Sequence, residues 1–447
     1  MSTPRRIAVI GGGWAGCAAA VALTDAGFEV ELLEAAAQLG GRARRVTRHG
    51  YTLDNGQHLV LGAYAETRRL LARLHERVPA QWRPLAIEPF ASRQTDAFAL
   101  RAHRLPAPLH LLVAILGARG LTPFERVATL RWFGRLRRAH YRCDPPQTVG
   151  DLTATLPAAA AAKLLHPLCL AALNTPPADA SAQVFANVLR AVFGADAHGA
   201  DVMHVTTDLG TLVADAAARW LHARQQHVEL QATACIADVH PGRVAIDVHA
   251  STREYAAVLV AVAPHQLARA FALPLVARER TLGAALDQVA QLAWEPITTV
   301  YLGYARRVEL PQALIRLDDR PGQWLFDRPD VAASAGAAAA RLAMVVAVVL
   351  SAHGPHDALA HDALAAAVDA QLRRVRATWP ALAWSQVIEE KRATYACTPH
   401  AQRPQAGMLM PGVALAGDYT DAEFPATLEA AVRSGNRAAA ALAATLG

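Results

Sequence analysis

The fold is decided by the stretch Ile7-Ala-Val-Ile-Gly-Gly-Gly-Trp-Ala-Gly16, close to the N-terminus. Its first four residues form an apolar run typical of a buried strand, and an Ala-rich helix is expected from Cys17 to Asp25. Between them, the spacing Gly11-x-Gly13-x-x-Gly16 allows a tight turn and a close backbone approach to a pyrophosphate at the helix N-terminus. This context predicts a Rossmann-like dinucleotide-binding unit in which Trp14 and Ala15 of the turn also contact the ligand.

An acidic residue follows where this unit needs one. A second strand is expected from Glu29 to Leu33, and Glu34 closes it, 23 residues after Gly11. A carboxylate at that position accepts hydrogen bonds from ribose hydroxyls. A glycine-rich turn alone also occurs in α/β proteins that bind no nucleotide, so it is the combination of strand, glycines, helix and acid that favours a dinucleotide containing ADP.

Further segments favour FAD over NAD. Leu39-Gly-Gly-Arg42 can set a guanidinium against phosphate oxygens, and Asp418, at the end of a strand, can hold ribityl hydroxyls. The helix expected from Thr427 to Leu446 would aim its positive N-terminus at the flavin, which is anionic when reduced. The other candidate FAD contacts from these segments are Gly41, Asn55, Gly56, Gln57, Gly417, Thr427 and Leu428.

Composition excludes several classes of protein. With 53% hydrophobic and 18% charged residues among 447, the chain is not globally disordered. Its five cysteines are scattered without a CxxC, so neither a disulfide scaffold nor a metal site is expected. No flavinylation motif is recognisable, which favours non-covalent FAD.

Nothing in the sequence resembles a spanning segment. The N-terminus lacks a signal peptide, and the most apolar window, residues 331–352, contains Arg341. Its end, from Met344 to Leu350, is better explained as a buried strand. We therefore expect a cytoplasmic protein.

The positive charge is concentrated in one segment. Between Arg101 and Arg142 there are nine arginines and a single acid, Glu125, whereas the whole chain has a net charge of +6. The same segment holds the apolar run Leu109 to Leu116. It predicts either a peripheral contact with an anionic membrane, on the inner face of the cell membrane, or a solvated arginine face on a helical hairpin. No recognised motif supports nucleic-acid binding.

Beyond the dinucleotide motifs, four segments resemble one family. They are Asp54-Asn-Gly-Gln-His58, Pro167 to Pro177 (which contains Leu-Asn-Thr-Pro-Pro), Gln323-Trp-Leu-Phe-Asp-Arg328 and Leu415-Ala-Gly-Asp-Tyr-Thr420. Together with the glycine turn they resemble the hydroxysqualene dehydroxylases, the squalene-associated branch of the FAD-dependent amine oxidase and phytoene desaturase superfamily. The resemblance touches both ends and the middle of the chain.

The resemblance implies a flavoenzyme that reduces hydroxysqualene, a long C30 isoprenoid, to squalene in hopanoid and squalene biosynthesis. It implies an α/β fold: a Rossmann-like FAD-binding domain with an inserted mixed α+β substrate domain. The FAD-binding domain would comprise residues 1–95, 205–290 and 396–447; residues 96–204 would be helical and face substrate or membrane, and residues 291–395 would supply the substrate-domain sheet.

Two alternatives remain open. One is a carotenoid or phytoene-type FAD desaturase or isomerase, and the other is a non-catalytic prenyl-lipid binding protein of the same fold. The retained Glu34 and Gly417-Asp418 favour an enzyme, because a binding protein has no need of ribose and ribityl ligands.

Catalytic residues are less clearly marked than cofactor residues. His58 lies beside a turn that contacts flavin by analogy, and imidazole suits proton transfer, but a bond to cofactor or backbone would explain it equally. Glu423, just before the C-terminal helix, is a second candidate for the catalytic acid. Asn174 and Thr175 are candidate substrate contacts, although an Asn before Pro-Pro is also a plain loop.

Overall fold

The structure is a computed structural model, and it describes residues 6–87, 98–106, 108–194, 197–336 and 342–446. Arg341 and the domain boundary expected at residues 95 and 96 lie outside these ranges.

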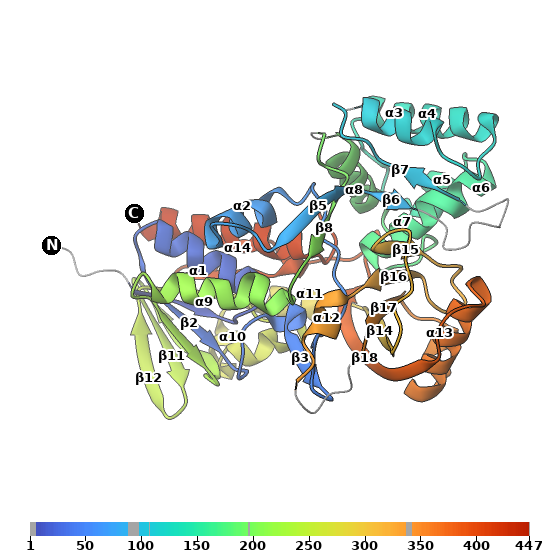
Figure 1. Cartoon of the computed structure of the whole chain (residues 1–447). Helices are drawn as coiled ribbons and strands as arrows, with labels where there is room; N and C mark the ends of the chain where they lie inside the picture. The colour runs from blue at the N-terminus through green and yellow to red at the C-terminus, as the bar shows by residue number, and fades with distance from the viewer. Residues whose placement is uncertain (1–5, 88–97, 107, 195–196, 337–341, 447) are drawn as a thin grey trace.

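A six-stranded sheet holds the first strand of the chain near its centre (Figure 1). β1 pairs in parallel with β2 and β13, so that Ile10 lies between Leu33 and Val260. β9 and β20 extend the parallel order, and β19 is antiparallel to β20 at one edge. Across the sheet the strands are β19 (Gly407–Met410), β20 (Val413–Leu415), β13 (Ala257–Val260), β1 (Arg6–Ile10), β2 (Glu29–Glu34) and β9 (His227–Leu230).

Both faces of this sheet are covered, which explains why β1 and β13 are apolar without alternation. Helices α1 (Trp14–Asp25), α9 (Asp215–His222) and α14 (Leu428–Leu446) pack on one face. A three-stranded antiparallel sheet of β10 (Ala234–His240), β11 (Arg243–Val248) and β12 (Ser251–Tyr255) covers the other (Figure 1).

A second, antiparallel sheet forms a separate layer. Helix α13 (His361–Val375) packs against it, and α12 (Pro329–Ala333) contacts one of its strands. In order, its strands are β15 (Leu314–Arg316), β16 (Trp324–Asp327), β17 (Met344–Ser351), β14 (Trp294–Tyr304) and β18 (Leu382–Tyr395). Every residue of β17 is buried, which confirms the strand predicted within the apolar window.

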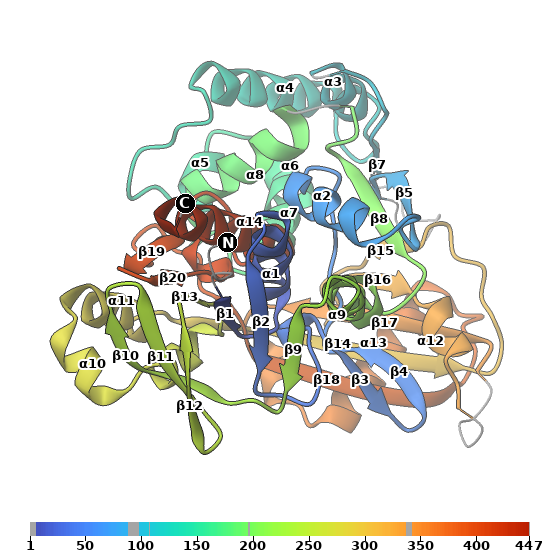
Figure 2. The same cartoon turned by 90° about the vertical axis from the view of Figure 1, so that its left-hand side faces the viewer.

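A helical region lies at the top of the molecule in both views (Figures 1 and 2). It contains α3 (Leu109–Leu116), α4 (Pro123–Arg138), α5 (Val149–Thr153), α6 (Ala158–Ala160), α7 (His166–Leu173) and α8 (Ala182–Gly194). The remaining helices and strands are α2 (Ala65–Leu74), α10 (Leu273–Arg278), α11 (Arg280–Ala290), β3 (Arg45–Arg48), β4 (Tyr51–Asp54), β5 (Ala80–Pro84), β6 (Ala86–Ile87), β7 (Leu100–Arg101) and β8 (Asp201–Val205).

The predicted fold class is confirmed: a Rossmann-like α/β unit with an inserted mixed region. The main sheet draws its strands from residues 6–34, 227–260 and 407–415, which fall inside the segments assigned to the FAD-binding domain. The domain boundaries themselves stay predictions. None of the helices in the described ranges combines the length and apolarity needed to cross a bilayer.

Candidate active site

The glycine turn brings β1, α1 and Glu34 together. The Glu34 carboxylate accepts hydrogen bonds from the N–H groups of Gly12, at 2.6 Å, and Ala36, at 2.8 Å. A Cβ on Gly16 would collide with the carbonyl oxygen of Gly11. Gly13 begins α1 with no side-chain cap and no acidic residue in the first turn, so the N–H groups there are not neutralised by a protein anion. This is the arrangement that a pyrophosphate needs.

Gly41 and Arg42 lie between this turn and the C-terminal motif. A Cβ on Gly41 would stand only 3.2 Å from the Cα of Gly13, so the two glycine segments are in close contact. Arg42 Nη2 is 2.5 Å from Asp418 Oδ1, and its Nη1 donates to the carbonyl of Ala393 at 2.6 Å. The guanidinium keeps further N–H donors, so the predicted contact of Arg42 with phosphate is compatible with this pair and stays a prediction.

The turn at residues 54–58 links the site to the second sheet. Asn55 Nδ2 donates to Glu390 Oε2 at 3.1 Å and to the carbonyl of Arg42 at 3.3 Å. The N–H of Gln57 donates to Thr299 Oγ1 on β14 at 3.3 Å. Gly56 has a φ of +142°, a conformation that glycine adopts far more readily than other residues.

One buried ion pair in this turn was not predicted from the sequence. Arg328 Nη1 lies 2.9 Å from Asp54 Oδ2 and donates to Gln57 Oε1 at 2.6 Å. The guanidinium also donates to both carboxylate oxygens of Asp330. Asp54 is held further by the N–H of Leu209, at 2.9 Å. Both members of the pair stood in motifs that were recognised separately, but spacing along the chain gave no sign that the motifs meet.

His58 is partly buried in the same turn. Its Nδ1 is 2.9 Å from the carbonyl oxygen of Gly56, which can only accept, so Nδ1 carries the proton and Nε2 is an acceptor. Burial lowers the pKa of His58, the bond to Gly56 opposing this in part. This hydrogen bond is the one expected if His58 stabilises the backbone of the turn. The catalytic role of His58 stays a prediction.

The other candidates outside the cofactor motifs are engaged elsewhere. Glu423 is half exposed and its carboxylate contacts Arg433, at 2.6 Å, and Arg190, at 3.7 Å. Asn174 ends α7 with a φ of +48°, donates to the carbonyl of Pro296 and to Thr394 Oγ1, and accepts from the N–H of Ala352.

Thr175 accepts from the N–H of Cys397 at 2.9 Å and donates to the carbonyl of Leu173. Asn174 and Thr175 therefore join α7 to the second sheet and to the segment that follows β18. Their predicted contact with substrate remains a prediction.

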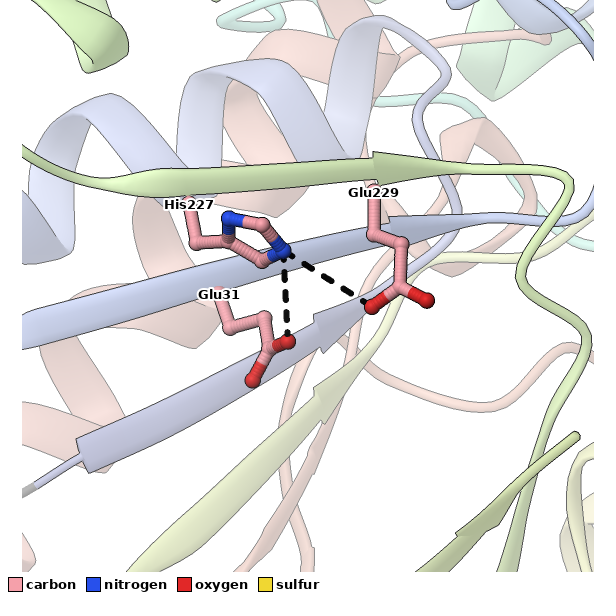
Figure 3. A group of neighbouring side chains, drawn as sticks. All are labelled: Glu31, His227 and Glu229. Atoms are coloured by element: carbon pink, nitrogen blue, oxygen red, sulfur yellow. Dashed lines mark ion pairs between the residues drawn. The ribbon is translucent and has the colours of Figure 1, made fainter. Parts of the chain in front are cut away.

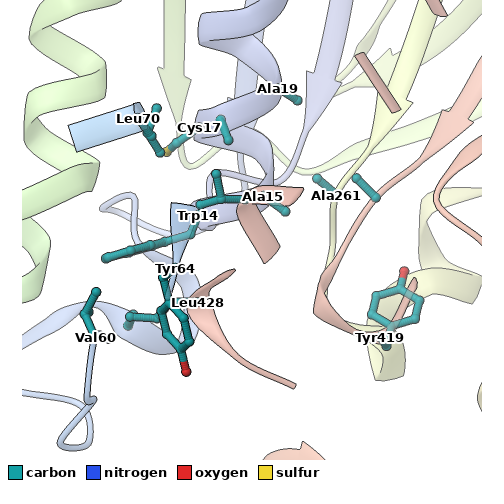
Figure 4. Close-up of a cluster of buried hydrophobic side chains, with 14 of the residues drawn as sticks. Trp14, Ala15, Cys17, Ala19, Val60, Tyr64, Leu70, Ala261, Tyr419 and Leu428 are labelled. Carbon is teal, nitrogen blue, oxygen red and sulfur yellow. The ribbon is translucent and has the colours of Figure 1, made fainter. Parts of the chain in front are cut away.

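The N-terminal ends of three helices meet beside the glycine turn. Trp14 begins α1, Tyr64 precedes α2 and Leu428 begins α14, and these side chains gather in one buried cluster (Figure 4). Thr427 Oγ1 caps α14 by accepting from the N–H of Ala430 at 3.2 Å. The Glu429 carboxylate is turned away to α2, where it accepts from the N–H groups of residues 66 and 67.

Two buried polar atoms here have no hydrogen-bond partner in the described ranges: Nε1 of Trp14 and the hydroxyl of Tyr419. Buried polar groups are normally hydrogen-bonded. One lies at the glycine turn and the other next to Asp418, on the two segments predicted to hold FAD. With the uncapped helix end and the crowded glycines, these groups fit a dinucleotide.

An open cleft of about 510 Å³ lies beside α7 and is lined also by the loop between β15 and β16 and by the segment that follows β17. Pro176 and Pro177 line it from one of the segments that carry the family resemblance, and Gln323 lines it from another. Leu170 and Leu359 add apolar surface. Two of the four segments that carry the family resemblance thus meet at one cleft.

A separate acidic cluster does not have the character of a metal centre. Glu31, His227 and Glu229 lie close together on β2 and β9, with their nearest ligand atoms within 4.8 Å (Figure 3). Arg253 donates to both carboxylates, at 2.8 and 2.5 Å, and Arg6 lies 2.5 Å from Glu31. Arginines thus already compensate this charge, and the cluster ties β2, β9 and β12 together.

Comparison with known proteins gives matches along nearly the whole chain. The model of the flavin containing amine oxidoreductase family matches residues 14–443. The hydroxysqualene dehydroxylase of Rhodopseudomonas palustris is 27% identical over 448 residues, which cover 97% of each chain. That of Zymomonas mobilis is 24% identical over 440 residues, 96% of this chain and 97% of the relative.

Two further comparisons show a shorter match and a likeness of the fold. The zeta-carotene desaturase of Synechocystis is 40% identical, but over only 70 residues, 15% of this chain and 14% of the relative. The structure of cyclohexylamine oxidase from Brevibacterium oxydans superimposes with a TM-score of 0.67, 16% identity and coverage of 99% and 100% of the two chains. At that identity the likeness shows the fold alone.

Proposed function

The chain belongs to the flavin containing amine oxidoreductase family, and from this premise we propose that it reduces hydroxysqualene to squalene with loss of water. The protein is an FAD-dependent oxidoreductase. Its sequence is similar to those of relatives whose names refer to isoprenoid substrates. The non-catalytic prenyl-lipid binder is not proposed, because the family is one of oxidoreductases.

The observation that carries the proposal is the whole-length match to hydroxysqualene dehydroxylases, over 97% of both chains in the first case. The match to a carotenoid desaturase covers only 15% of this chain. The cleft at Pro176, Pro177 and Gln323 supports the same choice, because two of the segments that resemble hydroxysqualene dehydroxylases contribute to it.

The residues that would hold FAD form a continuous set. The start of α1 and Glu34 would bind the ADP part, Arg42 and Asp418 the middle, and the start of α14 the flavin end. When bound and reduced, FAD supplies the hydride that replaces the allylic hydroxyl, and non-covalent binding is part of the proposal.

A proton must join the departing hydroxyl so that it leaves as water. His58 and Glu423 remain candidates for its donor. Since burial lowers the pKa of His58, its ring is neutral at neutral pH and its Nε2 accepts rather than donates, so a direct role as acid would need prior protonation. A water-poor site would favour the reaction by keeping solvent from the developing allylic cation.

Purified protein should be yellow and release intact FAD on denaturation. Asp418→Ala removes a charged partner worth about 1.5–3 kcal/mol and should raise the Kd for FAD by roughly 10-fold or more, so that less FAD is retained on purification. Asp287→Ala, at an exposed carboxylate on α11, is the matched control. Full occupancy in Asp418→Ala would remove that residue from the site.

The reaction is tested by incubating chemically reduced protein with hydroxysqualene without oxygen and analysing the extract by mass spectrometry. Squalene formed in step with flavin reoxidation is the expected result. A desaturase or isomerase would act on a similar polyene. Desaturation would transfer electrons from the substrate to oxidised flavin, opposite to the direction proposed here. Formation of desaturated products by oxidised protein from phytoene or squalene, with no squalene from hydroxysqualene, would therefore favour that alternative.

A further inference from the structure

Exposed apolar side chains are concentrated on one helical hairpin. Of the ten large hydrophobic side chains that are exposed in the described ranges, six lie on α3 or in the first turns of α4. They are Leu109, Leu112, Val113, Leu116, Phe124 and Val127, with Phe124 exposed by 73%. In both views α3 and α4 form the outermost layer of the molecule (Figures 1 and 2).

The exposed residues follow helical spacing, so each helix presents one outward stripe. On α3 they occur at positions i, i+3, i+4 and i+7, while the opposite side is buried through His110, Leu111, Ala114 and Ile115. On α4 the stripe continues from Phe124 and Val127 into Arg131, Arg135 and Arg138, at spacings of three and four residues. Apolar and cationic side chains therefore share one face.

The cations on this face are not neutralised by the protein. Arg131, Arg135 and Arg138 form no ion pair with any carboxylate in the described ranges. The acid of the segment, Glu125, is engaged at the start of α4, where its side chain accepts from the N–H of Thr122 in a capping box. The surface is thus apolar at one end and strongly positive at the other.

We propose that this hairpin docks on an anionic lipid bilayer, with the outer stripe of α3 and Phe124 in the interface and the arginines of α4 on the lipid headgroups. Helix α3 has eight residues, roughly 12 Å, which is too short to cross a hydrocarbon core of about 30 Å. It suits a helix that lies in the interface plane. The positive charge of the stripe complements anionic lipid headgroups. A protein partner would need an equally acidic surface beside an apolar one.

The proposal is independent of the reaction and is tested without turnover. Wild-type protein is sedimented with vesicles of phosphatidylcholine alone or mixed with phosphatidylglycerol, at low salt and in about 0.5 M NaCl. We expect binding to the anionic vesicles that weakens with salt. Replacing Arg131, Arg135 and Arg138 by Gln should weaken it by roughly 100-fold, as about 1 kcal/mol per cation implies.

Matched variants separate this surface from general effects. Leu112→Ser with Phe124→Ser removes exposed apolar area on the hairpin, whereas Leu273→Ser removes a side chain exposed by 83% on α10, far from it. Gln at Arg48, Arg269 and Arg280 removes the same charge elsewhere on the surface. Only the hairpin variants should bind the anionic vesicles more weakly. All variants should keep the FAD spectrum and the thermal unfolding of the wild type.

Three outcomes would overturn the proposal. Wild-type protein could ignore anionic vesicles at low salt, which would leave the arginines merely solvated. The control variants could lose as much binding as the hairpin variants. Sedimentation velocity without lipid could show a dimer that the hairpin variants dissociate, which would assign the surface to a second copy of the chain.

Discussion

At the residue scale, His58 separates two interpretations that the sequence alone left open. His58→Asn keeps an N–H that can donate to the carbonyl of Gly56 but removes the titrating ring. If His58 stabilises the turn, His58→Asn should keep FAD and change kcat by less than about threefold. His58→Leu should lose FAD, because the carbonyl of Gly56 is left without its hydrogen-bond donor. Steady-state turnover and the flavin spectrum of both variants are the measurements. A fall in kcat of about 100-fold or more in His58→Asn, at full FAD occupancy, would instead assign proton transfer to the ring.

The ion pair between Arg328 and Asp54 also acts at this scale. Both side chains are almost fully buried, so removing one leaves the other charge uncompensated, which typically costs about 3–5 kcal/mol. Arg328→Met should therefore lower the free energy of unfolding by that amount in denaturant titrations and reduce FAD occupancy through the turn at residues 54–58. In a double-mutant cycle, adding Asp54→Asn should recover part of the loss. Strictly additive losses would mean that the two residues do not act as a pair.

Contacts between residues of the candidate site differ in how far the sequence could predict them. Glu34 and Gly12 lie in one local unit whose geometry is set by a strand, a turn and a helix, so their contact follows from spacing. Arg42 and Asp418 were each predicted at the cofactor, but their contact joins positions 376 residues apart. Asn174 was predicted to contact substrate, with a plain loop as the alternative; its amide binds backbone groups of Pro296 and Ala352, contacts that the sequence did not indicate. Pairing across such separations depends on tertiary packing, which periodicity does not encode.

At the element scale, the contact of α1 with α14 sets the position of both helix N-termini. Gly435 sits where a Cβ would collide with the carbonyl oxygen of Ala15, so the absence of a side chain allows the two helices to approach. Gly435→Ala should force α14 outwards, cost about 1–3 kcal/mol of unfolding free energy and weaken FAD binding. Gly283→Ala in α11 is the control, because nothing lies within 4 Å of its Cβ position and alanine should stabilise that helix by about 0.5–1 kcal/mol. Equal unfolding midpoints for the two variants would show that the helices do not need this close approach.

Helices and strands were predicted best where burial on both sides makes the pattern simple. The strand predicted from Met344 to Leu350 corresponds to β17, which is buried throughout. Helix α1 begins at Trp14, earlier than the predicted Cys17, because Gly13 adopts an extended conformation and lets the helix start at once. The hairpin of α3 and α4 was expected from its apolar and basic pattern, but which side of each helix faces outwards became clear only from its packing.

At the scale of the whole molecule, parallel strands from three distant parts of the chain form one sheet. The glycine motif predicted that such a sheet exists, but the order of its strands depends on pairings such as Val258 with Val413, which no local signal specifies. The inserted second sheet was expected only through the family resemblance. Several histidines are buried or partly buried between these layers, and this gives the molecule a dependence on pH that composition alone does not indicate.

Stability should fall as the pH drops below about 6.5, the usual pKa of histidine in an unfolded chain. Burial lowers the pKa of His58, His166, His204 and His356, so in the folded protein they stay neutral at a pH where the unfolded chain already binds protons. Because the unfolded state then holds more protons, their contribution is complete above that pKa and is lost as the pH falls through it. The pKa of His353 is raised by Asp357 and works in the opposite sense, but its side chain is 67% exposed and solvent screens the pair.

The apparent midpoint of thermal unfolding, followed by circular dichroism between about pH 8 and pH 5.5, should therefore decrease towards acid. Replacing His204 and His356 by Gln together should flatten this dependence, because two groups that take up protons only on unfolding are gone. His103→Gln, which changes an exposed histidine, is the surface control. Burial raises the pKa of Asp54, Glu295 and Glu429, but these carboxyl groups are present in the wild type and in every variant, so they do not account for a difference between them. If the double variant and the wild type lose stability in parallel, the buried histidines are not the groups that couple folding to pH.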